Sequence, residues 1–147
     1  AQSGDPMAFN FPQPMLHSSD YDFSFSGLKT AVLYAVQDIG EINSQTQADI
    51  AASFQHAATE VLIKKITKAL EDTGRESIVL AGGVAANKLL RNKISLLKSK
   101  LNVDVLYPPL SHCTDNAAMI AYLGSMKVNE ATFSLASHAK PRWPLGS

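Results

Sequence analysis

Two short stretches of this sequence carry residue types that could do chemistry. The first is 77–87, SIVLAGGVAAN, in which a short apolar run is followed by Gly82 and Gly83. Glycine has no Cβ, so the backbone can turn sharply there and a ligand can approach it closely. A helix beginning at this point would direct its free N–H groups and the positive end of its dipole over the turn. The pattern suits a nucleotide, although ordinary α/β turns also have this form.

The second stretch is 111–116, SHCTDN. We expect Asp115 in the first turn of a helix, where the dipole alone favours a carboxylate; it is alternatively a metal ligand or a carboxylate beside phosphate. His112 could share a metal, but two protein ligands leave a transition metal underfilled. Cys113 could be a nucleophile at a helix N-terminus, yet no histidine is clearly placed as its base. The sequence has no P-loop and no CxxC pair.

The surrounding pattern predicts how these two stretches are positioned. We expect a short buried strand beginning at Ser77, a helix from the glycine turn to about Lys100, and a second strand over 103–107, ended by two prolines. Strand, helix and strand in this order form a βαβ unit with parallel strands. A ligand would lie beyond the carboxyl ends of both strands, where the two stretches follow.

The N-terminal part predicts an arm and two helices. Prolines make 1–21 an extended or looping arm, which Phe9 and Phe11 would pin to a surface. Residues 22–26 alternate polar and aromatic side chains and could form a short strand. We expect a helix that has Ser26 as its N-cap, runs to Ile39 and is stopped by Gly40. A second, longer helix over about 46–72 would begin with a capping box of Ser44 and Gln47 and end at Gly74. Its apolar stripe includes Phe54.

The C-terminal part predicts one more helix and a closing arm. Thr114 or Cys113 would cap a helix that continues to about Lys127, and 140–145 would close on the domain around the one tryptophan. Two further features favour structural interpretations: His56 as a histidine at the edge of the core or on the surface, and one basic helix face as a solvated face rather than an RNA contact (Lys88, Arg91, Lys93, Lys98 and Lys100).

Composition narrows the class of protein. The 147 residues are 46% apolar with 13 basic and 13 acidic side chains, so we expect a globular domain without global attraction to nucleic acid. One cysteine fits a reducing cytosol, and no apolar run is long enough to predict a membrane span. The sequence opens without methionine, and we expect it to be part of a larger protein.

Several stretches, in order along the chain, resemble the TsaD family of bacterial tRNA N6-adenosine threonylcarbamoyltransferases, once labelled glycoproteases. The motifs are DFSFSGLKT at 22–30, AGGVAAN at 81–87 with Leu90-Arg91, CTDNAAMIA at 113–121, PRWPL at 141–145 and FPQPM at 11–15. The resemblance implies an α/β fold of the actin/Hsp70-like (ribonuclease H-like) ATPase type. The chain would be its C-terminal half, with 1–21 as an arm and 22–147 as a nucleotide-binding subdomain.

The resemblance also implies the site. Asn87 would contact a threonylcarbamoyl-adenylate formed from ATP, Gly82 and Gly83 would lie against its nucleotide, and Asp115 would bind a divalent metal, iron or zinc. The remaining metal ligands of the family come from an HxxxH motif, and the four histidines here have no such spacing. We therefore expect this polypeptide alone to be inactive and to hold metal weakly or not at all.

Implied partners are tRNA, a TsaB-like paralogue and a TsaE-like ATPase in the cytoplasm, without a membrane. Exposed inter-domain surface would favour self-association, which light scattering at two concentrations would test. Three alternatives stay open: a metallopeptidase, although HExxH is absent; an ATPase or sugar kinase of the same superfold; and a non-catalytic interaction module.

Overall fold

The computed structural model describes residues 1–130, and the predicted closing arm at 140–145 lies outside them. By their internal contacts the residues form two units, Ala1–Thr114 and a second that begins at Asp115, and each is described by itself. The first contains α1 (Ser26–Ile39), α2 (Ser44–Thr73), β1 (Ser77–Val79), the 3-10 turn η1 (Gly83–Ala86), α3 (Lys88–Leu101), β2 (Asp104–Leu106) and η2 (Leu110–His112). The second contains α4 (Ala117–Met126) and η3 (Val128–Glu130).

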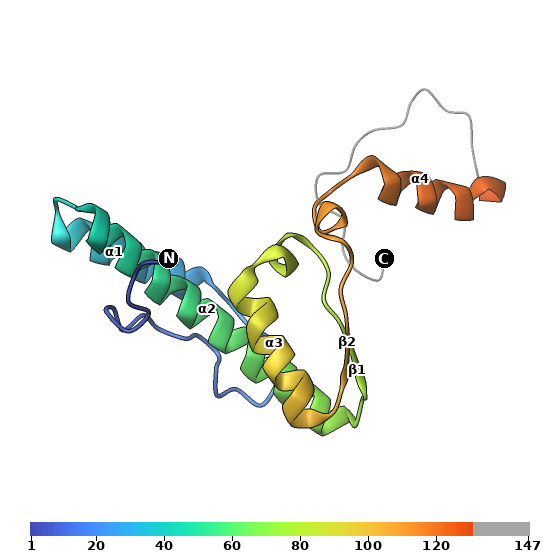
Figure 1. Cartoon of the computed structure of the whole chain (residues 1–147), viewed down its shortest axis with the longest axis horizontal. Helices are drawn as coiled ribbons and strands as arrows, with labels where there is room; N and C mark the ends of the chain where they lie inside the picture. The colour runs from blue at the N-terminus through green and yellow to red at the C-terminus, as the bar shows by residue number, and fades with distance from the viewer. Residues whose placement is uncertain (131–147) are drawn as a thin grey trace. The chain divides into compact units, whose positions relative to one another are not determined.

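β1 and β2 form a two-stranded parallel sheet, which confirms the predicted βαβ unit and the α/β class. Ser77 lies opposite Asp104 and Val79 opposite Leu106. Figure 1 shows α3 beside the C-terminal half of α2, and the core between them holds Leu70, Leu97 and Val103 with Ile78 against it. These helices cover one face of the sheet.

The prediction that the first strand is buried is wrong. Val79 is 68% exposed and its partner Leu106 is 59% exposed, whereas Ile78 and Val105 between them are half-buried. Successive side chains of a strand point to opposite faces, and only one face is covered here by described residues. The apolar run SIVL therefore indicated the strand correctly but not its burial.

α1 ends at Ile39 as predicted, while its N-terminus differs from the prediction in two ways. Residues 22–25 contain no strand, because no described segment pairs with them. Ser26 is the first helical residue and Phe25 occupies the N-cap position without a side-chain cap. The hydroxyl of Ser24 instead accepts a hydrogen bond from the Ser26 N–H at 3.3 Å.

α2 begins two residues earlier than predicted. Its N-cap is Asn43, whose Oδ1 accepts hydrogen bonds from the N–H and the hydroxyl of Thr46 at 2.8 and 3.0 Å. The predicted capping box of Ser44 and Gln47 does not form, because asparagine caps at least as well as serine and lies one residue earlier. Gly74 ends α2 in the left-handed conformation, as expected.

The N-terminal arm lies along α2 and runs in the same direction. Phe11 is buried with Leu28, Ile50 and Ala57, and Phe9 stacks on it with ring centroids 5.6 Å apart. The arm has no helix or strand over 1–25, so side chains of α2 satisfy part of its backbone. The Ser53 hydroxyl accepts from the Phe9 N–H and donates to the Asp5 carbonyl, both at 3.1 Å.

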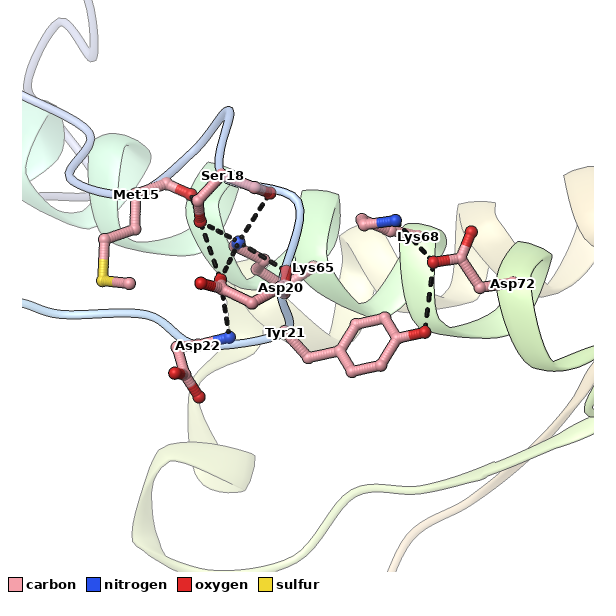
Figure 2. Close-up of polar contacts among 8 residues, drawn as sticks. All are labelled: Met15, Ser18, Asp20, Tyr21, Asp22, Lys65, Lys68 and Asp72. Atoms are coloured by element: carbon pink, nitrogen blue, oxygen red, sulfur yellow. Dashed lines mark hydrogen bonds and ion pairs between the residues drawn. The ribbon is translucent and has the colours of Figure 1, made fainter.

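Lys65 fixes the far end of the arm. Its side chain is only 5% exposed, and its ammonium points into the bend formed by residues 18–20 (Figure 2). It donates to the Ser18 hydroxyl at 2.7 Å, to the Ser18 and Asp20 carbonyls at 3.2 and 2.8 Å, and to Asp20 Oδ1 at 3.2 Å. A buried ammonium is tolerated only with such partners, so this bend is held to α2 by a satisfied charge.

A second polar contact follows one residue along the arm. The Tyr21 hydroxyl donates to Asp72 Oδ2 at 3.1 Å, and Lys68 donates to the same oxygen at 2.5 Å (Figure 2). Hydrogen bonds from Lys68 and then Tyr21 lower the pKa of Asp72, and the same carboxylate raises the pKa of Tyr21.

No described helix is long and apolar enough to cross a membrane.

Acid is expected to weaken the Lys65 contact. The Ser18 hydroxyl, and then Lys65, hold the pKa of Asp20 below its ordinary value of 3.8. A lowered folded-state pKa gives stability that is present above the unfolded-state value and is lost as the pH falls through the folded-state value. The fall in Tm from about pH 5 to about pH 3 should therefore be smaller in Asp20→Asn than in the wild type.

Circular dichroism melts at both pH values measure this difference, with Asp38→Asn, at an exposed position on α1, as the matched control. The control should keep the acid sensitivity of the wild type. Equal acid sensitivity of Asp20→Asn and the wild type would contradict the assignment.

Candidate functional site

The two glycines after β1 have different structural roles. Gly82 has φ 82° and ψ 174°, a region that only glycine adopts without strain, and its carbonyl accepts from the Ala85 N–H at 3.0 Å. Gly83 is not among the described residues with positive φ. A Cβ added at Gly83 would meet nothing within 4 Å. The backbone requires glycine at position 82, whereas at position 83 the fold itself gives no reason for it.

Asn87 joins the turn to the helix. The predicted helix from the glycine pair is in fact the 3-10 turn η1, followed by α3 from Lys88. Asn87 ends the first and caps the second, with its Oδ1 accepting from the Leu90 N–H at 3.0 Å. Its Nδ2 donates no hydrogen bond to any other described residue, so this amide can still donate to a ligand. The cap itself was not predicted.

A pocket of about 530 Å³ lies between α2 and this turn. Gly83 and Asn87 line it, together with Phe25 at the start of α1; the other lining residues are Phe54, Gln55, Ala58, Thr59, Leu62, Val84 and Ala86. The lining is mostly apolar with a few polar groups, as is usual for small-molecule sites. Gly82 is not among the lining residues.

Sequence analysis did not identify the wall contributed by α2. Phe54 was expected on the apolar stripe, but it is 40% exposed because it faces this pocket. Phe54, Ala58 and Leu62 follow one another at four-residue intervals, so they share one face of α2. A second apolar face beside the core face is the signal that could have indicated the wall.

The basic face of α3 is partly used within the fold. Lys93 donates to Glu60 Oε1 at 2.6 Å and to the hydroxyl of Thr59, a pocket residue, at 2.9 Å. Arg91 donates to the Ala85 carbonyl and lies over the Tyr107 ring. Lys98 forms an exposed ion pair with Asp104 at 3.8 Å. Three of the five charges therefore have partners within the fold, which favours the interpretation that this face is not an RNA contact.

Asp115 does not lie in the first turn of a helix, so that prediction is wrong. α4 begins at Ala117, and its N-cap is Asn116, whose Oδ1 accepts from the Met119 N–H at 3.1 Å. Neither Thr114 nor Cys113 is the cap, because asparagine occupies the residue next to the helix. Asp115 is exposed and is the first residue of the second unit, whereas Gly82, Gly83 and Asn87 belong to the first.

The described residues do not form a complete metal site. No three His, Cys, Asp or Glu side chains within 1–130 come close enough together to hold an ion. Asp115 is thus a single carboxylate, and His112 lies in the exposed turn η2. A single donor does not fit a structural or catalytic transition-metal centre. Cys113 is only 2% exposed, which argues against a freely accessible nucleophile.

The structure is an α/β fold in which a parallel βαβ unit presents a glycine turn to a mostly apolar pocket. Comparison with known families is more specific. Residues 1–122 match TsaD, described as tRNA N6-adenosine threonylcarbamoyltransferase. This match covers most of the 147 residues, and the chain belongs to the TsaD family.

Individual relatives agree with the family. A tRNA N6-adenosine threonylcarbamoyltransferase of Chromobacterium violaceum is 48% identical over 151 aligned positions, which cover 100% of this chain and 44% of that protein. A protein of the same name from Thermosipho africanus is 57% identical over 124 positions, covering 84% of this chain and 37% of the relative. The chain spans less than half the length of these curated relatives.

The two glycines should respond differently to alanine. Gly82→Ala is expected to lower the free energy of unfolding by about 1–3 kcal/mol, the usual cost of holding a side chain in such a backbone region. Gly83→Ala should leave it unchanged or raise it by up to about 1 kcal/mol, because alanine restricts the unfolded chain. Urea denaturation followed by circular dichroism measures both, and a Gly83→Ala loss as large as that of Gly82→Ala would contradict the distinction.

Proposed function

We propose that this chain supplies the nucleotide-binding side of a tRNA N6-adenosine threonylcarbamoyltransferase of the actin/Hsp70-like ATPase fold. The observation that carries this proposal is the pocket lined by Gly83 and Asn87, both within the AGGVAAN motif of a chain that belongs to the TsaD family. Gly83 has open space where a side chain would project. Room for a ligand explains glycine at this position better than the fold does.

The chemistry of the lining fits an adenosine. Flat apolar surfaces favour a purine ring, and Phe25 and Phe54 supply aromatic faces in the lining. The Nδ2 of Asn87, which donates to no other described residue, offers a donor to a ring nitrogen or a ribose oxygen. Because Oδ1 of the same side chain caps α3, the amide is held in one orientation before the ligand binds.

In the proposed reaction, the N6 amine of an adenosine beside the tRNA anticodon attacks the carbamoyl carbon of threonylcarbamoyl-adenylate. A C–N bond forms, the bond from that carbon to the phosphate oxygen breaks, AMP leaves, and N6 loses a proton. This chain would bind and orient the adenylate, since holding two reactants in line contributes a large part of such catalysis. Gly82 shapes the turn, and Gly83 and Asn87 contact the nucleotide.

We further propose that Asp115 is one ligand of an iron or zinc ion whose other ligands are two histidines in HxxxH spacing, absent from this sequence. Residues 1–21 would act as an arm and 22–147 as the nucleotide-binding subdomain. The partners would be tRNA, a TsaB-like paralogue and a TsaE-like ATPase in the cytoplasm. Self-association would cover exposed apolar positions such as Val79 and Leu106.

ATP is the probe for the nucleotide pocket. Titrated into the isotope-labelled chain, it should shift the amide resonances of Gly82 and Gly83 with weak affinity. Asn87→Asp should retain stability, since aspartate caps a helix as well as asparagine does. It should weaken ATP binding by about tenfold, because one donor is lost and a second negative charge is added. Unchanged affinity in Asn87→Asp, or shifts confined to residues outside the pocket, would overturn the proposed site.

The isolated chain should neither transfer the group nor retain a metal. Purified chain, given threonylcarbamoyl-adenylate and unmodified tRNA, should leave the tRNA unmodified, because the acyl carbonyl is not polarised by a complete site. Elemental analysis of the same sample after dialysis should find far less than one iron or zinc per chain. The full-length protein from Chromobacterium violaceum is the positive control for transfer. Turnover equal to that control, or one tightly held ion, would contradict the proposal.

A further inference from the structure

The side chain of Arg91 contacts the loop after β1 and, at two points, the loop after β2. Its Nε donates to the carbonyl of Ala85 in the turn η1, and its Nη2 lies 3.4 Å from the sulfur of Cys113. Its guanidinium carbon lies 4.8 Å from the centroid of the Tyr107 ring. All four residues belong to the first unit, so these contacts lie within one body.

These contacts connect the two loops that follow the parallel strands. Ala85 lies in the loop after β1, between Gly83 and Asn87 of the pocket. Tyr107 follows β2 directly, and Cys113 ends the loop after β2, two residues before Asp115. The Cys113 thiol also lies 3.6 Å from the Pro109 carbonyl, which keeps this loop folded back on itself.

The geometry requires arginine rather than a general positive charge. Arg91 lies one helical turn after Asn87, and its own N–H donates to the Asn87 carbonyl at 3.1 Å, so its side chain begins beside the turn. A planar guanidinium can donate in its plane to Ala85 and Cys113 while its face stacks on Tyr107. A lysine ammonium has no such plane and cannot make the three contacts together.

We propose that Arg91 is a positioning residue that couples the Gly82–Asn87 turn to the loop 107–113, so that the two loops change conformation together. The importance of this coupling rests on the proposed function, in which the first loop holds the nucleotide and the second leads to the metal carboxylate. The contacts themselves are independent of that function. Arg91 thus holds the two loops together, as the backbone hydrogen bonds of the sheet hold the two strands together.

A purely structural role is the alternative, and the sheet offers a second route between the loops. The Leu80 N–H donates to the Leu106 carbonyl at 3.0 Å, so a disturbance at Tyr107 could reach the glycine turn through the strands. If Arg91 has only a structural role, its replacement should lower the stability of the fold. It should not determine whether a conformational change in one loop alters the other loop. The two roles can therefore be separated by experiment.

The first measurement uses the only cysteine in the sequence as a reporter. Cys113 is buried under Arg91, so a thiol reagent should label it slowly in the ligand-free wild type. Arg91→Gln should raise the labelling rate by about tenfold, the factor expected when a charge-assisted hydrogen bond is lost. Arg91→Lys should restore little of the protection.

Arg75→Gln makes the same chemical change at an exposed position and should stay within about twofold of the wild type. Circular dichroism must show that each variant is folded at the labelling temperature. Folded Arg91→Gln that labels as slowly as Arg75→Gln would overturn the proposal. Tyr107→Leu, which removes the stacking surface but keeps Arg91, provides the second variant in case Arg91→Gln does not fold.

The second measurement tests the coupling itself. In the protein that retains Arg91, Tyr107→Leu should shift the amide resonances of Gly82 and Gly83. In the protein that carries Arg91→Gln, the same Tyr107→Leu substitution should cause no such shift. The same shift in both backgrounds means that the sheet carries the effect, and no shift in either means that the loops are independent. Both results would overturn the proposal.

ATP then separates this inference from the proposed function. Where ATP binds, it should change the rate of Cys113 labelling in the wild type and leave that rate unchanged in Arg91→Gln. An equal change in both proteins would count against Arg91 as the link. Absence of ATP binding would refute the proposed function, while the ligand-free labelling and the amide shifts would still decide the role of Arg91.

Discussion

Parallel pairing of β1 with β2 is the constraint on which the rest of the first unit depends. Two adjacent strands with the same direction require a crossover, and here α3 makes it, packed on α2 through Leu97 and Leu70. The pairing also brings the loops after both strands to one edge of the sheet. The glycine turn and the loop 107–113 are neighbours for this reason, although about twenty residues of α3 and β2 separate them in the sequence.

The glycine turn is held in place by the residues around it. Gly82 takes a backbone conformation closed to other residues, and η1 is too short to be stable by itself. Two side-chain hydrogen bonds stabilise it, since Asn87 caps α3 and Arg91 donates to the Ala85 carbonyl. Ala85 is also fully buried. Preorganisation of this kind is what a binding site needs, since a ligand then does not have to order the loop.

Sequence reasoning succeeded where one strong local rule decided the outcome. The stops at Gly40 and Gly74, the long periodic α2 and the parallel βαβ unit all follow from glycine conformation and apolar spacing. It failed where two acceptable residues competed or where a distant partner decided. Asn43 and Asn116 occupy the N-cap positions that were predicted for neighbouring residues. Residues 22–25 have no described strand to pair with, and Val79 lies on a face of the sheet that no described residue covers. The pocket itself needed Phe25, Phe54 and Asn87 to meet from three elements, which spacing along one chain cannot show.

In the proposed site, Asn87 would link the stability of the fold to ligand binding. Its side-chain oxygen accepts from the Leu90 N–H, and the nitrogen of the same planar amide donates to no other described residue. The orientation of the donor is therefore fixed by the start of α3, whose position depends in turn on Arg91 and the sheet. A ligand that accepts a hydrogen bond from this nitrogen would also stabilise the N-cap of α3. By linkage, anything that loosens the cap should also cost affinity in the pocket.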